Sequence, residues 1–169
     1  MPEDYANAHA HVLANLLGDA DPDLAEFGRT TLPGNRILFA GLAKNALSLN
    51  QRTYIEGIGA TVLAPSDLDA DFGNVAEWVR ASGASKLLIH FDLDVLDPRV
   101  FRSQLFAPPG PVDPEVASHG SGKLTFEQVI ALIGRAGENA EVVALSITEH
   151  LPWDAENLQM ALRKLPLLG

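Results

Sequence analysis

Cysteine is absent from this chain of 169 residues. That absence excludes a disulfide framework, a thiolate metal site and a cysteine nucleophile. Basic residues are scarce as well, because 12 Lys and Arg stand against 22 Asp and Glu, for a net charge of −10. We expect such an acidic chain to bind neither nucleic acid nor an anionic membrane. No apolar run approaches the ~18 residues that span a bilayer, and the acidic first residues have no signal-peptide pattern. These features predict a water-soluble, cytoplasmic protein.

Four short apolar runs alternate with amphipathic stretches, which predicts an α/β fold with a mostly parallel sheet in a single domain over 1–169. Each run is almost continuous in apolar residues, a pattern typical of strands that are buried on both faces. Thr125 and Gln128 form a capping box at the start of one expected helix, and Asp154 is the expected N-cap of the last. The expected strands cover 36–42, 60–65, 86–94 and 141–148, and the expected helices cover 8–17, 51–57, 72–81, a segment after 125 and a segment that ends near Pro166.

The expected strand 86–94 ends in two carboxylates, Asp92 and Asp94, and leads into a long loop rich in proline and glycine. Side chains at i and i+2 of a strand lie on the same side. Two such carboxylates repel each other when buried unless a cation holds them together, and hard divalent ions prefer carboxylate oxygens. The pattern therefore predicts a metal site. The alternative is that both aspartates cap backbone amides in the loop.

Histidines and one glutamate are the other candidate functional residues. His9 and His11 lie in an expected helix, where side chains two positions apart diverge by about 200°, so the pattern favours solvent-facing histidines over a shared metal. Glu149 follows the last expected strand and would share a sheet edge with Asp92 and Asp94. Its carboxylate could hold a cationic substrate there, and the alternative is an exposed loop acid. The segment 119–122 lacks the strand and the Lys-Ser/Thr of a phosphate loop.

Three motifs resemble the ureohydrolases, the family of arginases, agmatinases and formiminoglutamases. They are His-Phe-Asp-Leu-Asp-Val-Leu-Asp-Pro over 90–98, Gly-Lys-Leu-Thr over 122–125 and Ala-Leu-Ser-Ile-Thr-Glu over 144–149. The resemblance implies a three-layer α/β/α fold and a binuclear Mn²⁺ site whose bridging hydroxide hydrolyses a C–N bond of a linear guanidino or formimino compound. It makes Asp92 and Asp94 metal ligands and places Glu149 beside the substrate guanidinium.

The N-terminal segment 2–22 resembles a later part of the family pattern, in which His9 matches the proton-shuttle histidine of the active site. On this alignment the chain corresponds to the C-terminal half of the family domain, and the N-terminal part of the fold is missing. The family motifs Gly-Gly-Asp-His and Asp-Ala-His-x-Asp, which carry most metal ligands, are absent. Ala46 stands where the family has the acid that binds the substrate amine, which argues against arginine as substrate.

These departures lead to two expectations. The chain alone should bind Mn²⁺ weakly and be inactive or nearly so, because two aspartates cannot supply the donors of two metal ions. Without the missing strand, apolar edges should stay exposed and favour a homo-oligomer.

Two alternatives stay open. A non-catalytic remnant or interaction module could keep half of the scaffold. The sequence 91–94 also resembles the nucleophile motif of haloacid-dehalogenase-like phosphatases, in which Asp92 would attack phosphate and Asp94 would act as acid and base.

Overall fold

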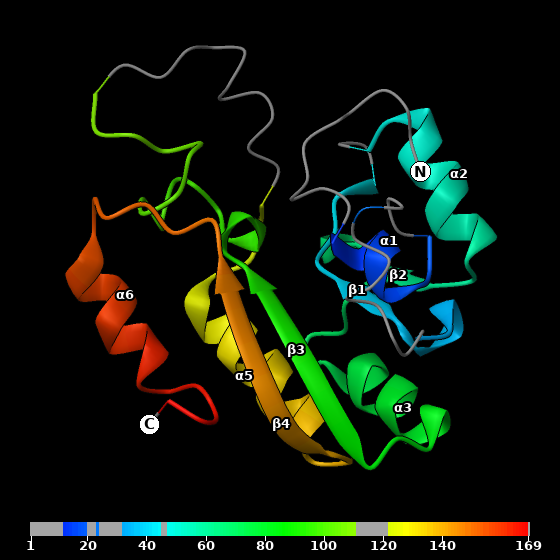
Figure 1. Cartoon of the computed structure of the whole chain (residues 1–169). Coiled ribbons are helices and arrows are strands. Elements are labelled where there is room, and N and C mark those ends of the chain that lie inside the picture. Colours follow the sequence, from blue (N-terminus) through cyan, green and yellow to red (C-terminus); the bar gives the residue numbers. More distant parts are fainter. Residues whose placement is uncertain (1–11, 20–22, 24–31, 45–46, 111–121, 169) are drawn as a thin grey trace. The chain divides into compact units, whose positions relative to one another are not determined.

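Strands and helices alternate along the chain in the computed structural model (Figure 1), as the sequence predicted. The structure describes residues 12–19, 23, 32–44, 47–110 and 122–168. The chain forms two compact units, one made of 1–39 and 44–62 and the other of 40–43 and 63–169. The elements in chain order are α1 (Val12–Leu16), β1 (Leu38–Ala40), α2 (Leu49–Gly57), β2 (Thr61–Leu63), α3 (Gly73–Ser82), β3 (Lys86–Asp92), α5 (Phe126–Gly137), β4 (Glu141–Thr148) and α6 (Ala155–Leu162).

Helix starts follow local capping chemistry. At α5 the predicted capping box is confirmed: the Gln128 amide donates to Thr125 Oγ1 at 3.3 Å, and the Thr125 amide donates to Gln128 Oε1 at 2.8 Å. A second capping box, between Ser48 and Gln51, starts α2 two residues before the predicted 51. Asp154 precedes α6 as predicted, but its carboxylate accepts from the Asn157 side-chain amide and not from a helix N–H.

The four strands form two pairs among the described residues, β1 with β2 and β3 with β4. Strands β3 and β4 are parallel, and His90 lies opposite Ser146 and Asp92 opposite Thr148. Figure 1 shows both arrowheads at the same end of the pair. The side chains that follow these strands therefore start from one edge of the sheet.

The core of the larger unit lies against one face of β3 and β4. Phe91 of β3 packs there with side chains of α5 and α6 and of the segment after β3. The nine buried members of this cluster are Phe91, Leu93, Leu96, Phe101, Leu124, Val129, Ile133, Leu158 and Leu165. Within the described residues, no helix is long and apolar enough to cross a bilayer.

The opposite face of β3 is exposed, so the prediction that this run is buried on both faces is wrong. Leu88 is 76% exposed, and Lys86, His90 and Asp92 on the same face are exposed too. The apolar sequence of the run is that of a two-sided strand. The strand nevertheless has only one covered face, because the apolar cluster that contains α5 and α6 packs around the alternate residue Phe91.

Candidate functional site

The parallel pairing of β3 and β4 brings the predicted acidic residues to one edge. Asp92 is the last residue of β3, and Glu149 comes directly after β4. The strand predicted over 86–94 ends at Asp92, and Asp94 lies instead in a short 3-10 turn, Leu93–Val95, whose first side chain is completely buried. We call Asp92, Asp94 and Glu149 the acidic rim.

The two aspartates of the rim have different partners. Asp92 Oδ1 accepts a hydrogen bond from the Asp94 amide at 3.0 Å. Asp92 thus does what the alternative interpretation proposed, because its side chain caps a backbone amide. Asp94 does not, since its Oδ1 is buried and has no hydrogen-bond partner among the residues that the structure describes. A buried carboxylate oxygen without a donor costs free energy, and a cation is one way to satisfy it.

Electrostatics connect all three members of the rim. Burial, together with the negative charges of Asp92 and Glu149, raises the pKa of Asp94 to about 7. Glu149 adopts a left-handed backbone conformation with φ 62°, which is costly for a residue with a Cβ and is found preferentially at functional sites. The rim is therefore a place where negative charge is crowded and a cation is favoured.

A histidine on the exposed face of β3 was not singled out as a functional residue by the sequence. His90 Nδ1 lies 2.8 Å from Ser146 Oγ, and His90 Nε2 lies 3.3 Å from Thr148 Oγ1. Both hydroxyls belong to β4, so the ring ties the two strands together just before Asp92. The contacts of His90 follow from the parallel register of β3 and β4. That register cannot be inferred from either segment alone.

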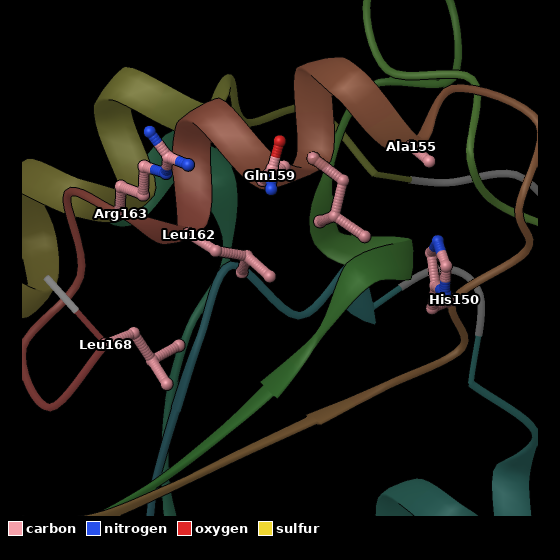
Figure 2. Close-up of a pocket in the computed structure, with 7 residues that line it drawn as sticks. His150, Ala155, Gln159, Leu162, Arg163 and Leu168 are labelled. Carbon is pink, nitrogen blue, oxygen red and sulfur yellow. The ribbon is translucent and has the colours of Figure 1, made fainter.

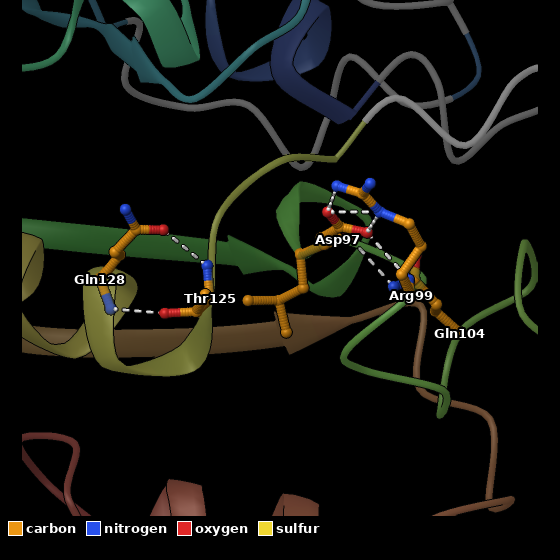
Figure 3. Close-up of polar contacts among 6 residues, drawn as sticks. Asp97, Arg99, Gln104, Thr125 and Gln128 are labelled. Carbon is orange, nitrogen blue, oxygen red and sulfur yellow. Dashed lines mark hydrogen bonds and ion pairs between the residues drawn. The ribbon is translucent and has the colours of Figure 1, made fainter.

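Beyond the rim, Asp97 forms a clamp with Arg99. The guanidinium holds both carboxylate oxygens, with Nε at 2.9 Å from Oδ1 and 3.0 Å from Oδ2 and with Nη2 also on Oδ2 (Figure 3). The Arg99 amide adds a bond to Oδ1 at 2.8 Å. These hydrogen bonds hold the pKa of Asp97 down at about 2. The clamp starts the long loop in a defined conformation.

The described part of the long loop is packed, although its composition suggested an irregular segment. Gln104 is completely buried, and its Nε2 donates to the carbonyls of Leu96 and Phe101 at 3.0 and 2.9 Å. Ser103 is also completely buried, and its Oγ accepts from the Asp154 amide at 2.7 Å. The loop is thereby joined to the segment that leads into α6.

The motif 122–125 starts with a glycine because the backbone at Gly122 lies against another backbone segment. A Cβ at this position would lie 2.2 Å from the carbonyl oxygens of Asp94 and Leu96. The next residues run beside the turn, where the Lys123 and Leu124 amides donate to the Val95 carbonyl and the Asp97 amide donates to the Leu124 carbonyl. Gly122 therefore allows a second backbone segment to support the turn between the rim and the clamp.

The chain is similar in structure to two arginases. Over 86% of its length the chain matches the crystal structure of an arginase from Entamoeba histolytica in complex with L-ornithine, at a TM-score of 0.63 and 16% sequence identity. It matches the Helicobacter pylori arginase over 81% of its length, at a TM-score of 0.60 and 18% identity. The fold is arginase-like. The chain spans about half the length of these arginases, 46% and 44% respectively. No protein-family model and no curated protein matches the sequence.

In this arginase-like fold the rim does not complete a two-metal centre. Among the described residues, no three His, Asp or Glu side chains are grouped so that they could hold a metal ion. Asp94 offers one unpartnered oxygen, but Asp92 is partly used by its hydrogen bond to the Asp94 amide. His9, the predicted proton shuttle, lies outside the described residues, as do His11 and Ala46.

The arginase-like fold also carries a shallow groove of about 370 Å³ along α6. Figure 2 shows the lining residues, most of them on one side of the helix. Leu158, Leu162 and Leu168 are the leucines among the lining residues, and His150 and Arg163 are the basic ones. His150 is next to Glu149 in sequence, but the groove does not include Asp92 or Asp94. It is therefore distinct from the acidic rim.

Proposed function

We propose that this chain carries part of a ureohydrolase-type site, in which the acidic rim binds cations. Asp92 and Asp94 would hold Mn²⁺, and Glu149 would contact the cationic guanidino or formimino group of a small linear substrate. His9 would relay protons. The observation that supports the proposal best is the buried Oδ1 of Asp94, which has no partner among the described residues of this arginase-like fold. The pKa of Asp94 is raised to about 7 beside two further carboxylates.

Charge and the number of donor groups determine how the acidic rim can bind a cation. Three crowded carboxylates repel one another, so a bound cation stabilises their ionised forms. A divalent ion such as Mn²⁺ takes about six oxygen or nitrogen donors. The described residues group fewer than three side-chain donors, so water has to complete the shell. The chain by itself should then hold at most one Mn²⁺, weakly, and should not hydrolyse ureohydrolase substrates.

A second candidate is a non-catalytic module that keeps the arginase-like scaffold. The absence of a three-donor group among residues 12–19, 23, 32–44, 47–110 and 122–168 favours it. The two candidates differ in what happens at the rim. A site that belongs to a hydrolase binds Mn²⁺ through Asp94. A scaffold module has no Mn²⁺ binding that depends on Asp94.

Calorimetric titration of the whole chain with Mn²⁺ at pH 8 tests the proposal, since Asp94 is mostly ionised there. We expect weak binding of about one ion per chain, lost in Asp94→Asn and kept in Glu156→Gln, an exposed acid on α6. Release of urea or formamide from arginine, agmatine or formiminoglutamate should stay at the level without protein. No Mn²⁺ binding supports the scaffold candidate. Two tightly bound Mn²⁺ per chain would overturn the conclusion that the site is incomplete.

A further inference from the structure

The outer edge of β3 is an unpaired strand edge in the described structure. Strand β3 pairs with β4 along one side, and no other described strand pairs with it. It is seven residues long, and its uncovered face includes Leu88, which is 76% exposed. A long edge strand with an exposed apolar side chain is a template for pairing with another strand. A two-stranded sheet also gains stability when further strands extend it.

The residues of β3 make this edge complementary to itself. When two copies of β3 pair antiparallel with all seven residues overlapping, Lys86 of each copy lies opposite Asp92 of the other. Leu88 then lies opposite His90, and Ile89 lies on the two-fold axis. Opposite charges directly across two strands attract, and like charges repel. The register with the greatest overlap is thus also the register that matches the charges at both ends.

The side chains that would meet on the open face are available for contact. Lys86, Leu88, His90 and Asp92 are all exposed, and the His90 ring is held in place by Ser146 and Thr148. A fixed imidazole offers a flat surface against which the Leu88 side chain of a second copy can pack. Because the same patch serves both copies, the contact closes as a two-fold dimer and does not propagate into a filament.

We propose that a second copy of this chain docks on the free edge of β3, forming a continuous four-stranded sheet in the order β4, β3, β3, β4. The dimer does not rest on the proposed function, because its register follows from the sequence and length of β3 and not from a bound metal. The sequence predicts a homo-oligomer, and this proposal places its interface at the free edge of β3.

Sedimentation equilibrium of charge-swapped variants tests this interface. Lys86→Asp places two aspartates opposite each other at both ends of the interface, and Asp92→Lys places two lysines there. We expect each to weaken dimerisation about tenfold or more, and the double variant to return to within about threefold of the wild-type dissociation constant. Met160→Lys, on the exposed side of α6, should leave dimerisation unchanged.

Asp92 also caps the Asp94 amide, so Asp92→Lys could fail to fold, and a second measurement avoids this substitution. The chain has no cysteine, which allows a clean cross-linking test with Leu88→Cys and His90→Cys made as separate proteins. In an oxidising buffer, a mixture of the two should form a disulfide-linked dimer, and neither alone should do so to a similar extent.

Three outcomes would overturn the proposal. The first is a chain that stays monomeric at the highest concentration reached. The second is a dimer that responds to Met160→Lys and not to Lys86→Asp. The third is a mixture of the two cysteine variants that gives no more cross-linked dimer than each variant alone. None of these outcomes bears on Mn²⁺ binding, so failure of this proposal and failure of the proposed function are distinguishable.

Discussion

Asp94 and Asp97 belong to the same loop after β3, yet their environments are opposite. Asp97 has a guanidinium and a backbone amide on its carboxylate, and its pKa is held down at about 2. Asp94 has a buried oxygen with no hydrogen-bond partner in the described part of the chain, and burial and two nearby carboxylates raise its pKa to about 7. Within the described residues, Asp97 therefore has a cationic partner, Arg99, whereas Asp94 Oδ1 has no partner.

This difference separates a structural carboxylate from a candidate functional one. A charge that is fully hydrogen-bonded within the chain stabilises the loop and has little capacity left for a ligand. A charge that is crowded and unpartnered costs free energy in the absence of a ligand, and such groups are concentrated at binding and catalytic sites. The contrast predicts that substitutions at the two aspartates change stability in different ways.

The largest effect is expected at the glycine that supports both aspartates. Gly122→Ala places a Cβ 2.2 Å from the carbonyl oxygens of Asp94 and Leu96. Backbone atoms cannot rotate away as a side chain can, so the turn and the segment 122–124 must separate. We expect a loss of about 2–4 kcal/mol in the free energy of unfolding, measured by urea denaturation.

Gly134→Ala is the matched control for this substitution. Gly134 lies inside α5, and its Cβ would meet no atom within 4 Å. Alanine favours the helix, so this variant should gain up to about 1 kcal/mol. If Gly122→Ala is as stable as Gly134→Ala, the close packing of the turn against 122–124 is wrong.

The second largest effect on the free energy of unfolding is expected when Asp97 or Asp94 is replaced by asparagine at pH 7. Asp97→Asn removes the charge that holds the Arg99 guanidinium, and we expect a loss of about 1–3 kcal/mol in unfolding free energy. Asp94→Asn removes a charge that the fold disfavours, so stability should stay within about 0.5 kcal/mol of wild type or rise. Thermal and urea unfolding of both variants measure this difference. Equal losses in the two variants would contradict the proposed distinction.

A smaller effect is expected in the pH dependence of stability. The pKa of Asp94 is 3.8 in an unperturbed chain and about 7 in the fold, so the folded state binds more protons than the unfolded state between these values. The stability that comes from neutral Asp94 is complete below pH 3.8 and is lost as the pH rises through 7. Melting temperatures of wild type should therefore fall more steeply between pH 4 and 8 than those of Asp94→Asn.

Asp97 contributes in the opposite direction and in a different range. Its pKa is lowered from 3.8 to about 2, so its stabilisation is present above pH 3.8 and is lost as the pH falls towards 2. The difference in melting temperature between wild type and Asp97→Asn should accordingly shrink in that acidic range. A difference that is constant from pH 2 to pH 7 would argue against the clamp as its source.

Much of the local structure was predictable from short-range patterns. The run 141–148 became β4 with those bounds, and Thr125 with Gln128 formed the expected capping box. The sequence also predicted a parallel partner for the strand 86–94 and two carboxylates at its end, but β3 ends at Asp92, and Asp94 lies in the 3-10 turn Leu93–Val95. The strand 141–148 and the capping box depend on residues close in sequence, which is why a single sequence reveals them, and the parallel pairing was inferred from the alternation of strands and helices along the chain.

Other features depended on contacts between distant segments. The exposed face of β3 was not predictable, because its apolar residues are those of a strand covered on both sides. The ties from His90 to Ser146 and Thr148 require the register of two strands. The partner of Asp97 is close in sequence, but a clamp that holds both of its carboxylate oxygens requires the side-chain geometry of the folded loop.

By itself, the sequence determined that this is an acidic α/β chain with paired carboxylates at the end of an apolar strand and with motifs that resemble those of the ureohydrolases. Only the tertiary structure decided that Asp97 is neutralised by Arg99 and that, within the described residues, Asp94 Oδ1 has no partner and β3 has one unpaired edge. The physical reason is that strand and helix formation depends on neighbouring residues. The charge state of a carboxylate and the covering of a strand depend instead on which distant groups the fold brings within a few ångströms.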